Sequence, residues 1–256
     1  MRIVTWNIWG KNGLYERRAA AILSSIKELN PDIICFQEFY LDLTLQGKRE
    51  FLNSFISLGY DKIVLPKDTD NQCRIGILSK FPLVDTTEIY LETDPHEKHQ
   101  RIALFAKVNA HRPLTLVTTH LDYRRWNGEL RGRQLSNIVS SALSFSSTQP
   151  IILCGDFNAT PNSEEIRRLR GEATPYVDAT VFLDCWDFSE GGDGFTWLSS
   201  NPLTEPIYHG NSRLDYIMIN YVPDHEHIIV SNCHRFGFPS EDFWPSDHLG
   251  LVADIF

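Results

Sequence analysis

Short apolar runs alternate along the chain with segments of helical periodicity. Residues 2–8 predict a strand, residues 14–29 a helix with apolar side chains three and four positions apart, and residues 33–36 a buried strand. A strand, a helix and a second strand within so short a segment favour parallel pairing of the two strands. A second helix is predicted over 47–58, where apolar side chains again share one face.

From residue 60 onward the pattern changes to short strands with few helices. Strands are predicted at 61–65, 73–79, 83–91, 102–109, 114–119 and 151–155, and near 178–187, 214–219, 227–235 and 250–255; helices are predicted at 130–146 and 163–170. No linker, low-complexity segment or repeat divides the chain, so residues 1–256 are expected to form a single domain. The alternation fits an α/β protein with two sheets.

Composition narrows the class of protein. The 256 residues are 42% hydrophobic and 22% charged, and no apolar run is long enough to cross a membrane. A chain of this length buries a sizeable core unaided, so a monomer without an obligate protein partner is expected. The five cysteines show no CxxC spacing, which argues against a thiolate zinc site, and Cys35 and Cys154 are expected to be buried.

The charge balance and the N-terminus bear on partners and location. The chain has 24 Lys and Arg against 33 Asp and Glu, a net charge of −9. This balance weighs against an extended nucleic-acid-binding face and is typical of a site that gathers carboxylates around a cation. No signal peptide is visible, so a cytoplasmic location is expected, with secretion the alternative if a signal peptide has been removed.

Polar side chains stand at the ends of the predicted strands. One such residue is usually a turn or cap residue. Because strand ends meet at the edge of a sheet, several of them together predict a shared site. Carboxylates of this set suit Mg²⁺, and its two histidines suit proton transfer near neutral pH. The set is Asn7, Glu38, His120, Asp156, Asn158, Asp215, Asp247 and His248.

The motifs around these residues resemble those of a known superfamily. They are Trp6-Asn7, Gln37-Glu38, Thr119-His120-Leu121, Gly155-Asp156-Phe157-Asn158, Arg213-Leu214-Asp215-Tyr216-Ile217 and Ser246-Asp247-His248. Their order and spacing, from residue 6 to 248, resemble the endonuclease/exonuclease/phosphatase superfamily, which includes DNase I-like nucleases, sphingomyelinases and deadenylases. The resemblance implies a DNase I-like α/β/β/α sandwich of two packed mixed sheets. It also implies Mg²⁺-dependent hydrolysis of phosphoester bonds, with Mn²⁺ as a substitute.

The resemblance also implies roles on the metal and water side of the site. Glu38 resembles the principal metal ligand, with Asn7 beside it and Asp247 as a further carboxylate near the metal. Asp156 resembles the residue that orients or deprotonates the attacking water, and Asn158 one that holds the phosphate or that water.

The histidines have implied roles on the phosphate side. His248 resembles the histidine beside the scissile phosphate, polarised by Asp215. His120 resembles the second histidine, which stabilises phosphate charge or protonates the leaving group. Whether Asp156 or His248 takes the proton of water stays open.

Two departures separate the chain from the AP endonuclease branch. Trp9 stands where that branch often has an acidic residue, which puts a second metal contact in doubt and predicts an aromatic wall. His120 replaces a Tyr common there. An abasic-site repair role is therefore disfavoured.

Several weaker features predict contacts with a substrate. Arg124 and Trp126 follow the His120 motif as a basic and aromatic lip, and Arg101 opens a strand from which it reaches toward the phosphate. A solvated loop and helix start is the favoured alternative for Arg124 and Trp126, and a buried ion pair explains Arg101 equally. His96, His99, His225 and His227 match no position of the superfamily and are expected at the surface.

The sequence favours a phosphodiesterase that uses in-line attack of an activated water. The acidic charge favours a small molecule or lipid headgroup over long duplex DNA as substrate. A nuclease acting on DNA or RNA is the alternative, and a phosphomonoesterase or a catalytically silent binding module are further alternatives.

Overall fold

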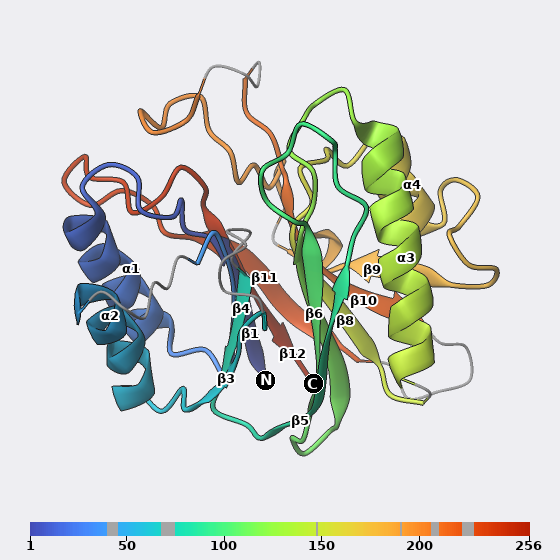
Figure 1. Ribbon diagram of the computed structural model, residues 1–256, viewed down its shortest axis with the longest axis horizontal. Helices are drawn as coiled ribbons and strands as arrows, with labels where there is room; N and C mark the ends of the chain where they lie inside the picture. The colour runs from blue at the N-terminus through green and yellow to red at the C-terminus, as the bar shows by residue number, and fades with distance from the viewer. Residues whose placement is uncertain (40–45, 68–74, 147, 190, 206–209, 222–227) are drawn as a thin grey trace.

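Two six-stranded sheets pack face to face in the computed structural model, which describes residues 1–39, 46–67, 75–146, 148–189, 191–205, 210–221 and 228–256 (Figure 1). Helices α1 (Tyr15–Leu29) and α2 (Gln46–Ser57) cover the outer face of the first sheet. Helices α3 (Gly128–Ser146) and α4 (Glu164–Arg170) cover that of the second. The predicted four-layer α/β/β/α sandwich is confirmed.

The strands follow one another across each sheet in a mixed order. The first sheet runs β11 (Val230–Phe236), β12 (Gly250–Ile255), β1 (Arg2–Asn7), β2 (Ile33–Gln37), β4 (Ile75–Ser79), β3 (Lys62–Val64). The second runs β5 (Leu83–Tyr90), β6 (Ile102–Val108), β7 (Leu114–His120), β8 (Ile151–Asp156), β10 (Asp215–Tyr221), β9 (Val181–Asp184).

Most predicted elements are confirmed to within a few residues, and one is substantially shorter than predicted. The strand expected near 178–187 ends at Asp184, because the Asp184 side chain accepts a hydrogen bond from the Trp186 backbone N–H at 3.0 Å and starts the 3-10 helix η1 (Cys185–Phe188). Residues 73–74 and 227 of two further predicted strands lie outside the described residues.

Apolar side chains fill three layers. The central layer lies between the sheets, and its members include the buried thiols of Cys35 and Cys154, as predicted. The outer layers pack each sheet against its helices. Strands buried on both faces read as continuous apolar runs, which is why alternation is weak in this sequence. In the described residues, no helix combines the length and apolar character needed to cross a membrane.

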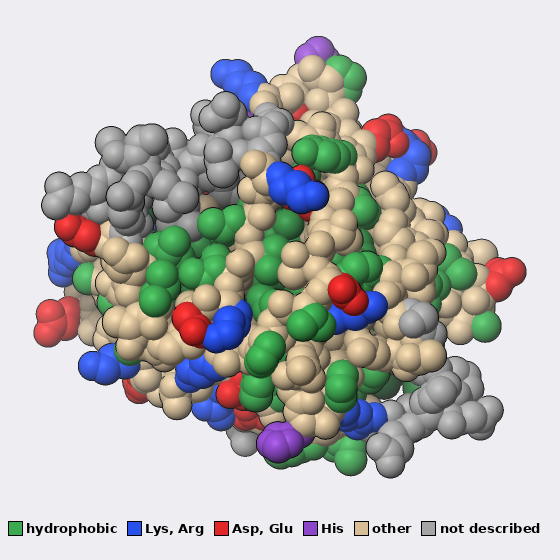
Figure 2. Space-filling model, turned by 60° about the horizontal axis from the view of Figure 1, so that its bottom comes forward, with side chains coloured by type: hydrophobic (Ala, Val, Ile, Leu, Met, Phe, Trp, Pro, Cys, Tyr) green, Lys and Arg blue, Asp and Glu red, His purple; other side chains and the backbone are tan. Residues whose placement is uncertain are grey.

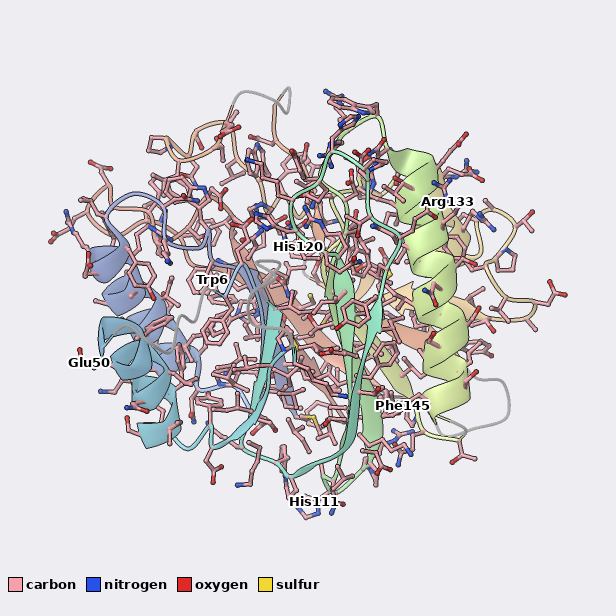
Figure 3. The ribbon with its side chains drawn as sticks, in the orientation of Figure 1. Trp6, Glu50, His111, His120, Arg133 and Phe145 are labelled. Atoms are coloured by element: carbon pink, nitrogen blue, oxygen red, sulfur yellow. The ribbon has the colours of Figure 1, made fainter. Side chains whose placement is uncertain are left out.

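Strand direction gathers the functional side chains at one edge. In the first sheet β1 pairs parallel with β2 and antiparallel with β12, and in the second β7 pairs parallel with β8, which pairs antiparallel with β10. The ends of β1, β2, β7 and β8 therefore lie at the same edge as the beginnings of β10 and β12. Figure 3 shows the two ends of β7: His120 lies at this edge and His111, in the preceding turn, at the opposite one.

Gly155 lets β7 and β8 approach each other at this edge. Its φ is +140°, and a Cβ there would lie 2.0 Å from the Thr119 carbonyl oxygen. We expect Gly155→Ala to lower the free energy of unfolding by about 2–4 kcal/mol through this clash, as measured by urea denaturation. Gly59 is the matched control, because it has a φ of +93° with open space around its Cβ position. Equal losses in the two variants would contradict the clash.

Candidate active site

A cavity of about 740 Å³ opens at the edge where the strand ends meet. Ten of the twelve predicted site residues line it, all but Asp215 and Trp126. Asp215 is fully buried behind His248, whereas Trp126 is 81% exposed on the loop between β7 and α3. The structure therefore brings together the metal-side and catalytic residues that the sequence predicts.

His248 and Asp215 form a buried pair. The Nδ1 atom of His248 lies 2.8 Å from Oδ2 of Asp215, so Nδ1 carries the proton and Nε2 faces the cavity. The edge of the Trp197 ring packs against the imidazole, with ring centroids 5.1 Å apart. The Nε1–H of Trp6 donates to the His248 carbonyl at 2.9 Å. These contacts fix the orientation of His248 and keep a proton on Nδ1.

The two histidines differ in charge. Burial lowers the pKa of His248, but the neighbouring Asp215 and Asp156 carboxylates outweigh burial and raise it well above the usual histidine value. Burial, with the positive charges of Arg101 and His248, lowers the pKa of His120 well below that value. The surroundings therefore favour the charged form of His248 and the neutral form of His120.

Asp156 lies at the centre of the site. Its Oδ2 atom is 3.4 Å from Nε2 of His120, 3.8 Å from Nε2 of His248 and accepts a hydrogen bond from Nδ2 of Asn7 at 3.0 Å. Its Oδ1 atom accepts the backbone N–H of Asn158 at 2.9 Å. Burial and the charge of Asp215 raise the pKa of Asp156 to about 7. One oxygen of this carboxylate thus lies within 4 Å of Nε2 of both histidines, and all three side chains line the cavity.

Glu38, Asp247 and Asp156 provide oxygen ligands that fit a divalent cation. Burial raises the pKa of Asp247 to about 7, and the charges of Glu38 and Asp156 add to this rise. A hard cation prefers such clustered carboxylates and relieves their repulsion. The amide nitrogen of Asn7 donates to Glu38 Oε1 at 3.1 Å, and its oxygen accepts the Trp9 N–H. The amide group of Asn7 thus bridges the carboxylates of Glu38 and Asp156. Its role as a metal ligand stays a prediction.

The described residues also include a second group of side chains that could hold a metal ion. The ligand atoms of Asp156, Asp215 and His248 lie within 4.8 Å of one another. A cation among them would break the hydrogen bond between Asp215 and His248 Nδ1. The predicted ligands Glu38 and Asp247 line the same cavity, and a cation beside them stays a prediction.

Strained backbone shapes the wall near Glu38. Trp9, Glu38 and Asn158 have φ values of 55°, 51° and 50°, a region that Asn tolerates but Trp and Glu rarely adopt. Arg18 of α1, which is only 1% exposed, holds this wall. Its guanidinium donates to the carbonyls of Ile8, Trp9, Gly10, Asn12 and Pro245.

Positioning residues of this kind escaped prediction from sequence. Arg18 sits inside an ordinary helical pattern, and nothing in that pattern distinguishes it. Asn201 donates from Nδ2 to the carbonyls of Ser246 and Asp247, at 2.9 and 3.1 Å, and so fixes the segment before His248. Both act on backbone carbonyls of distant segments, which no local pattern reveals.

Arg101 and Arg124 line the cavity, but acidic neighbours engage them. Glu97 Oε2 lies 3.2 Å from Arg101 and 3.4 Å from Arg124, and Asp122 lies 2.9 Å from Arg124. The buried ion pair that was the alternative for Arg101 is therefore present. Contact of either arginine with a substrate stays a prediction.

His96 and His99 line the cavity, which the sequence does not indicate. They lie at the surface, as expected, but that surface is the cavity wall, together with Lys98. His225 and His227 lie outside the described residues.

The sequence profile of the endonuclease/exonuclease/phosphatase family matches residues 4–248. The chain belongs to this family. The family consists of metal-dependent hydrolases that act on phosphoester bonds, which agrees with the carboxylates and histidines of the cavity.

Among curated relatives, Protein angel of Drosophila melanogaster is 30% identical over 70% of this chain. Nocturnin of Xenopus laevis and tyrosyl-DNA phosphodiesterase 2 of Gallus gallus are each 27% identical, over 99% and 98% of this chain. The chain spans 54%, 72% and 65% of the lengths of these three family members.

Solved structures share the fold. The structure of D. rerio TDP2 complexed with single-strand DNA product has a TM-score of 0.80 at 19% identity, covering 100% of this chain and 98% of that one. The human Nocturnin catalytic domain with bound sulfate has a TM-score of 0.74 at 22% identity, with 100% and 93% coverage. These likenesses confirm the DNase I-like sandwich for this family member.

Proposed function

We propose that this chain is a Mg²⁺-dependent phosphodiesterase that hydrolyses its substrate by in-line attack of water. One observation carries the proposal: His248, paired with the buried Asp215, lines one cavity together with the carboxylates of Glu38, Asp156 and Asp247. Such a site offers cationic and hydrogen-bonding groups to the phosphate on one side and oxygen ligands to a metal on the other.

Glu38 and Asp247 would hold the cation, with Asn7 beside them. Mg²⁺ suits these oxygens, and Mn²⁺ is expected to replace it. When bound, the cation offsets the charge of the phosphate and the charge that develops in the transition state.

The side chains around Asp156 supply the remaining parts of the reaction. Asp156 accepts a hydrogen bond from the attacking water and orients it toward phosphorus. His248 donates from Nε2 to a non-bridging phosphate oxygen while Asp215 holds its tautomer. His120, whose surroundings favour its neutral form, donates a second hydrogen bond to the phosphate. Asn158 lies in the same cavity, with its Nδ2 atom donating to the Leu121 carbonyl at 3.2 Å.

A nuclease is the second candidate, and the relatives favour it. One is named a tyrosyl-DNA phosphodiesterase, and a TDP2 structure contains a single-strand DNA product. A monomeric state, the absence of an obligate partner and a cytoplasmic location stay predictions for this chain.

Paired substrates test the proposed bond class. With Mg²⁺ we expect wild type to hydrolyse bis(p-nitrophenyl) phosphate, a diester, with a higher kcat/KM than p-nitrophenyl phosphate, a monoester. Asp156→Asn should lower diester turnover by about 10²- to 10⁴-fold, as loss of a group that positions water and takes part in proton transfer does. Asp178→Asn, at an exposed residue away from the cavity, is the control. Preference for the monoester would indicate a phosphomonoesterase.

A further inference from the structure

The loop between β7 and α3 is held unusually firmly by one buried arginine. Arg131, which is 4% exposed, donates to the carbonyls of Asp122, Arg124 and Arg125 at 3.2, 2.6 and 3.5 Å. Its Nε atom bonds Glu165 on α4 at 2.8 Å. The buried ion pair of Arg131 and Glu165 thus holds the backbone of the loop between β7 and α3.

Further hydrogen bonds hold the same loop from its other side. Asp122 is fully buried and accepts the Arg124 N–H at 2.9 Å and Nδ2 of Asn127 at 3.1 Å. Asn127 also donates to Asp94, at 2.9 Å, and Gln134 accepts the Asp122 N–H. The conformation of residues 122–127 is therefore fixed before any ligand arrives.

This rigid loop presents side chains that have no role within the fold. Trp126 is 81% exposed, and its indole has no ring contact or hydrogen bond among the described residues. Arg125 is exposed beside it, and within the same described part of the chain its guanidinium has no ion-pair partner. Tyr123 and Arg124 of the same loop line the catalytic cavity. The loop thus connects the cavity to an exposed indole and a free cation.

We propose that residues 123–126 form a stacking platform for a single-stranded nucleic acid. An unpaired base stacks on Trp126 and Arg125 contacts a backbone phosphate, while the scissile phosphate lies in the cavity. The proposal deepens the proposed function and rests on it, because it names the substrate of the same site.

The chemistry of the loop favours a nucleic-acid strand over a lipid surface. Exposed aromatic rings beside arginine are what sequence-tolerant strand binding uses, and a preformed platform lowers the entropy cost of binding. Glu129 is exposed on the first turn of α3, so the surroundings do not form the wide basic area that an anionic bilayer needs. Figure 2 brings forward the opposite end of the molecule, the bottom of the view in Figure 1, and there too basic and acidic side chains of the described residues are interspersed.

The net charge of −9 adds a second constraint on the substrate. Because the protein as a whole repels a polyanion, attraction must come from a few local contacts. A duplex offers no free base face except at its ends, since its bases are already stacked. We therefore expect single strands to be preferred over duplexes of the same sequence.

Cleavage of a fluorophore- and quencher-labelled single-stranded oligonucleotide tests the platform. The measured quantity is kcat/KM for the oligonucleotide divided by kcat/KM for bis(p-nitrophenyl) phosphate. Trp126→Ala should lower this ratio roughly 5- to 150-fold, through loss of stacking on one base. Trp126→Phe should retain much of it. Phe188→Ala, at an exposed aromatic residue beyond β9, is the matched control and should leave the ratio unchanged.

Arg125 is tested through salt. Arg125→Ala should reduce the slope of log KM against log salt concentration by about 0.7, the value for one phosphate contact on a single strand. Arg112→Ala is the control, because Arg112 precedes β7 and so lies at the opposite end of that strand from residues 122–127. An unchanged slope in Arg125→Ala would overturn the phosphate contact.

Three results would overturn the platform itself. They are an unchanged ratio in Trp126→Ala, no cleavage of the oligonucleotide by a wild type that hydrolyses bis(p-nitrophenyl) phosphate, and binding to phosphatidylserine vesicles that Trp126→Ala abolishes. The last result would assign the loop to a lipid surface. Failure of wild type on both substrates would instead refute the proposed function.

Discussion

His248→Ala lowers turnover of a phosphodiester by roughly 10³-fold, because it removes the cationic donor at the phosphate. The loss is large because the His248 imidazole is held in a fixed, buried position: it is 3% exposed and bonded to Asp215 at 2.8 Å. Among the described residues His120 is the other imidazole beside Asp156, and its surroundings lower its pKa and so favour the neutral form. The loss should appear in kcat more than in KM, because charge on the phosphate oxygens grows in the transition state.

Asp215→Asn gives the companion result. An amide at this position keeps the shape of the side chain but no longer raises the pKa of His248 or enforces its tautomer. We expect a loss of turnover approaching that of His248→Ala, and a double variant little worse than either single variant. His111→Ala, at the far end of β7, controls for general effects of histidine removal (Figure 3). Additive losses in the double variant would contradict a functional pair.

Glu38→Gln is expected to abolish measurable Mg²⁺ binding and most turnover. The substitution keeps the shape of the side chain and removes one of the negative charges that surround the cation position. Removing a residue that only hydrogen-bonds to a metal ligand lowers metal affinity 10- to 100-fold. Loss of the charge of the principal ligand should therefore lower Mg²⁺ affinity at least as much. Isothermal calorimetry with Mg²⁺ measures the affinity, and hydrolysis of bis(p-nitrophenyl) phosphate measures the turnover.

Glu50→Gln, on the exposed side of α2, is the matched control for Glu38→Gln. It removes the same charge from the chain and should leave metal binding unchanged. If Glu38→Gln binds Mg²⁺ as tightly as wild type, the metal lies elsewhere. The group formed by Asp156, Asp215 and His248 would then be the next candidate.

The predictable part of the site follows from strand ends. Asn7, His120 and Asp156 each end an apolar strand and Glu38 directly follows one, and the parallel pairs β1–β2 and β7–β8 place those ends together. Sequence periodicity captures this because a strand buried on both faces has few polar residues other than Thr except near its ends. The resemblance to the family then supplied the roles of the residues.

The unpredictable part consists of contacts between distant segments. Arg18 binds carbonyls of two loops, and Asn201 binds the carbonyls of the segment before His248. Neither contact leaves a trace in hydrophobic pattern or spacing, because the acceptors are backbone atoms. Trp126 shows the reverse case: the sequence indicates its chemistry, but only the structure shows that it lies outside the cavity on a rigid loop.

Turnover of chelator-treated protein tests the central claim most directly. Wild type is freed of metal with EDTA, transferred to metal-free buffer and assayed on bis(p-nitrophenyl) phosphate as Mg²⁺ is added. We predict no turnover without metal and a saturable return with Mg²⁺, and also with Mn²⁺. Turnover that persists without metal would contradict the assignment of Glu38 and Asp247. A folded protein with no turnover at saturating Mg²⁺ would indicate a binding module in place of an enzyme.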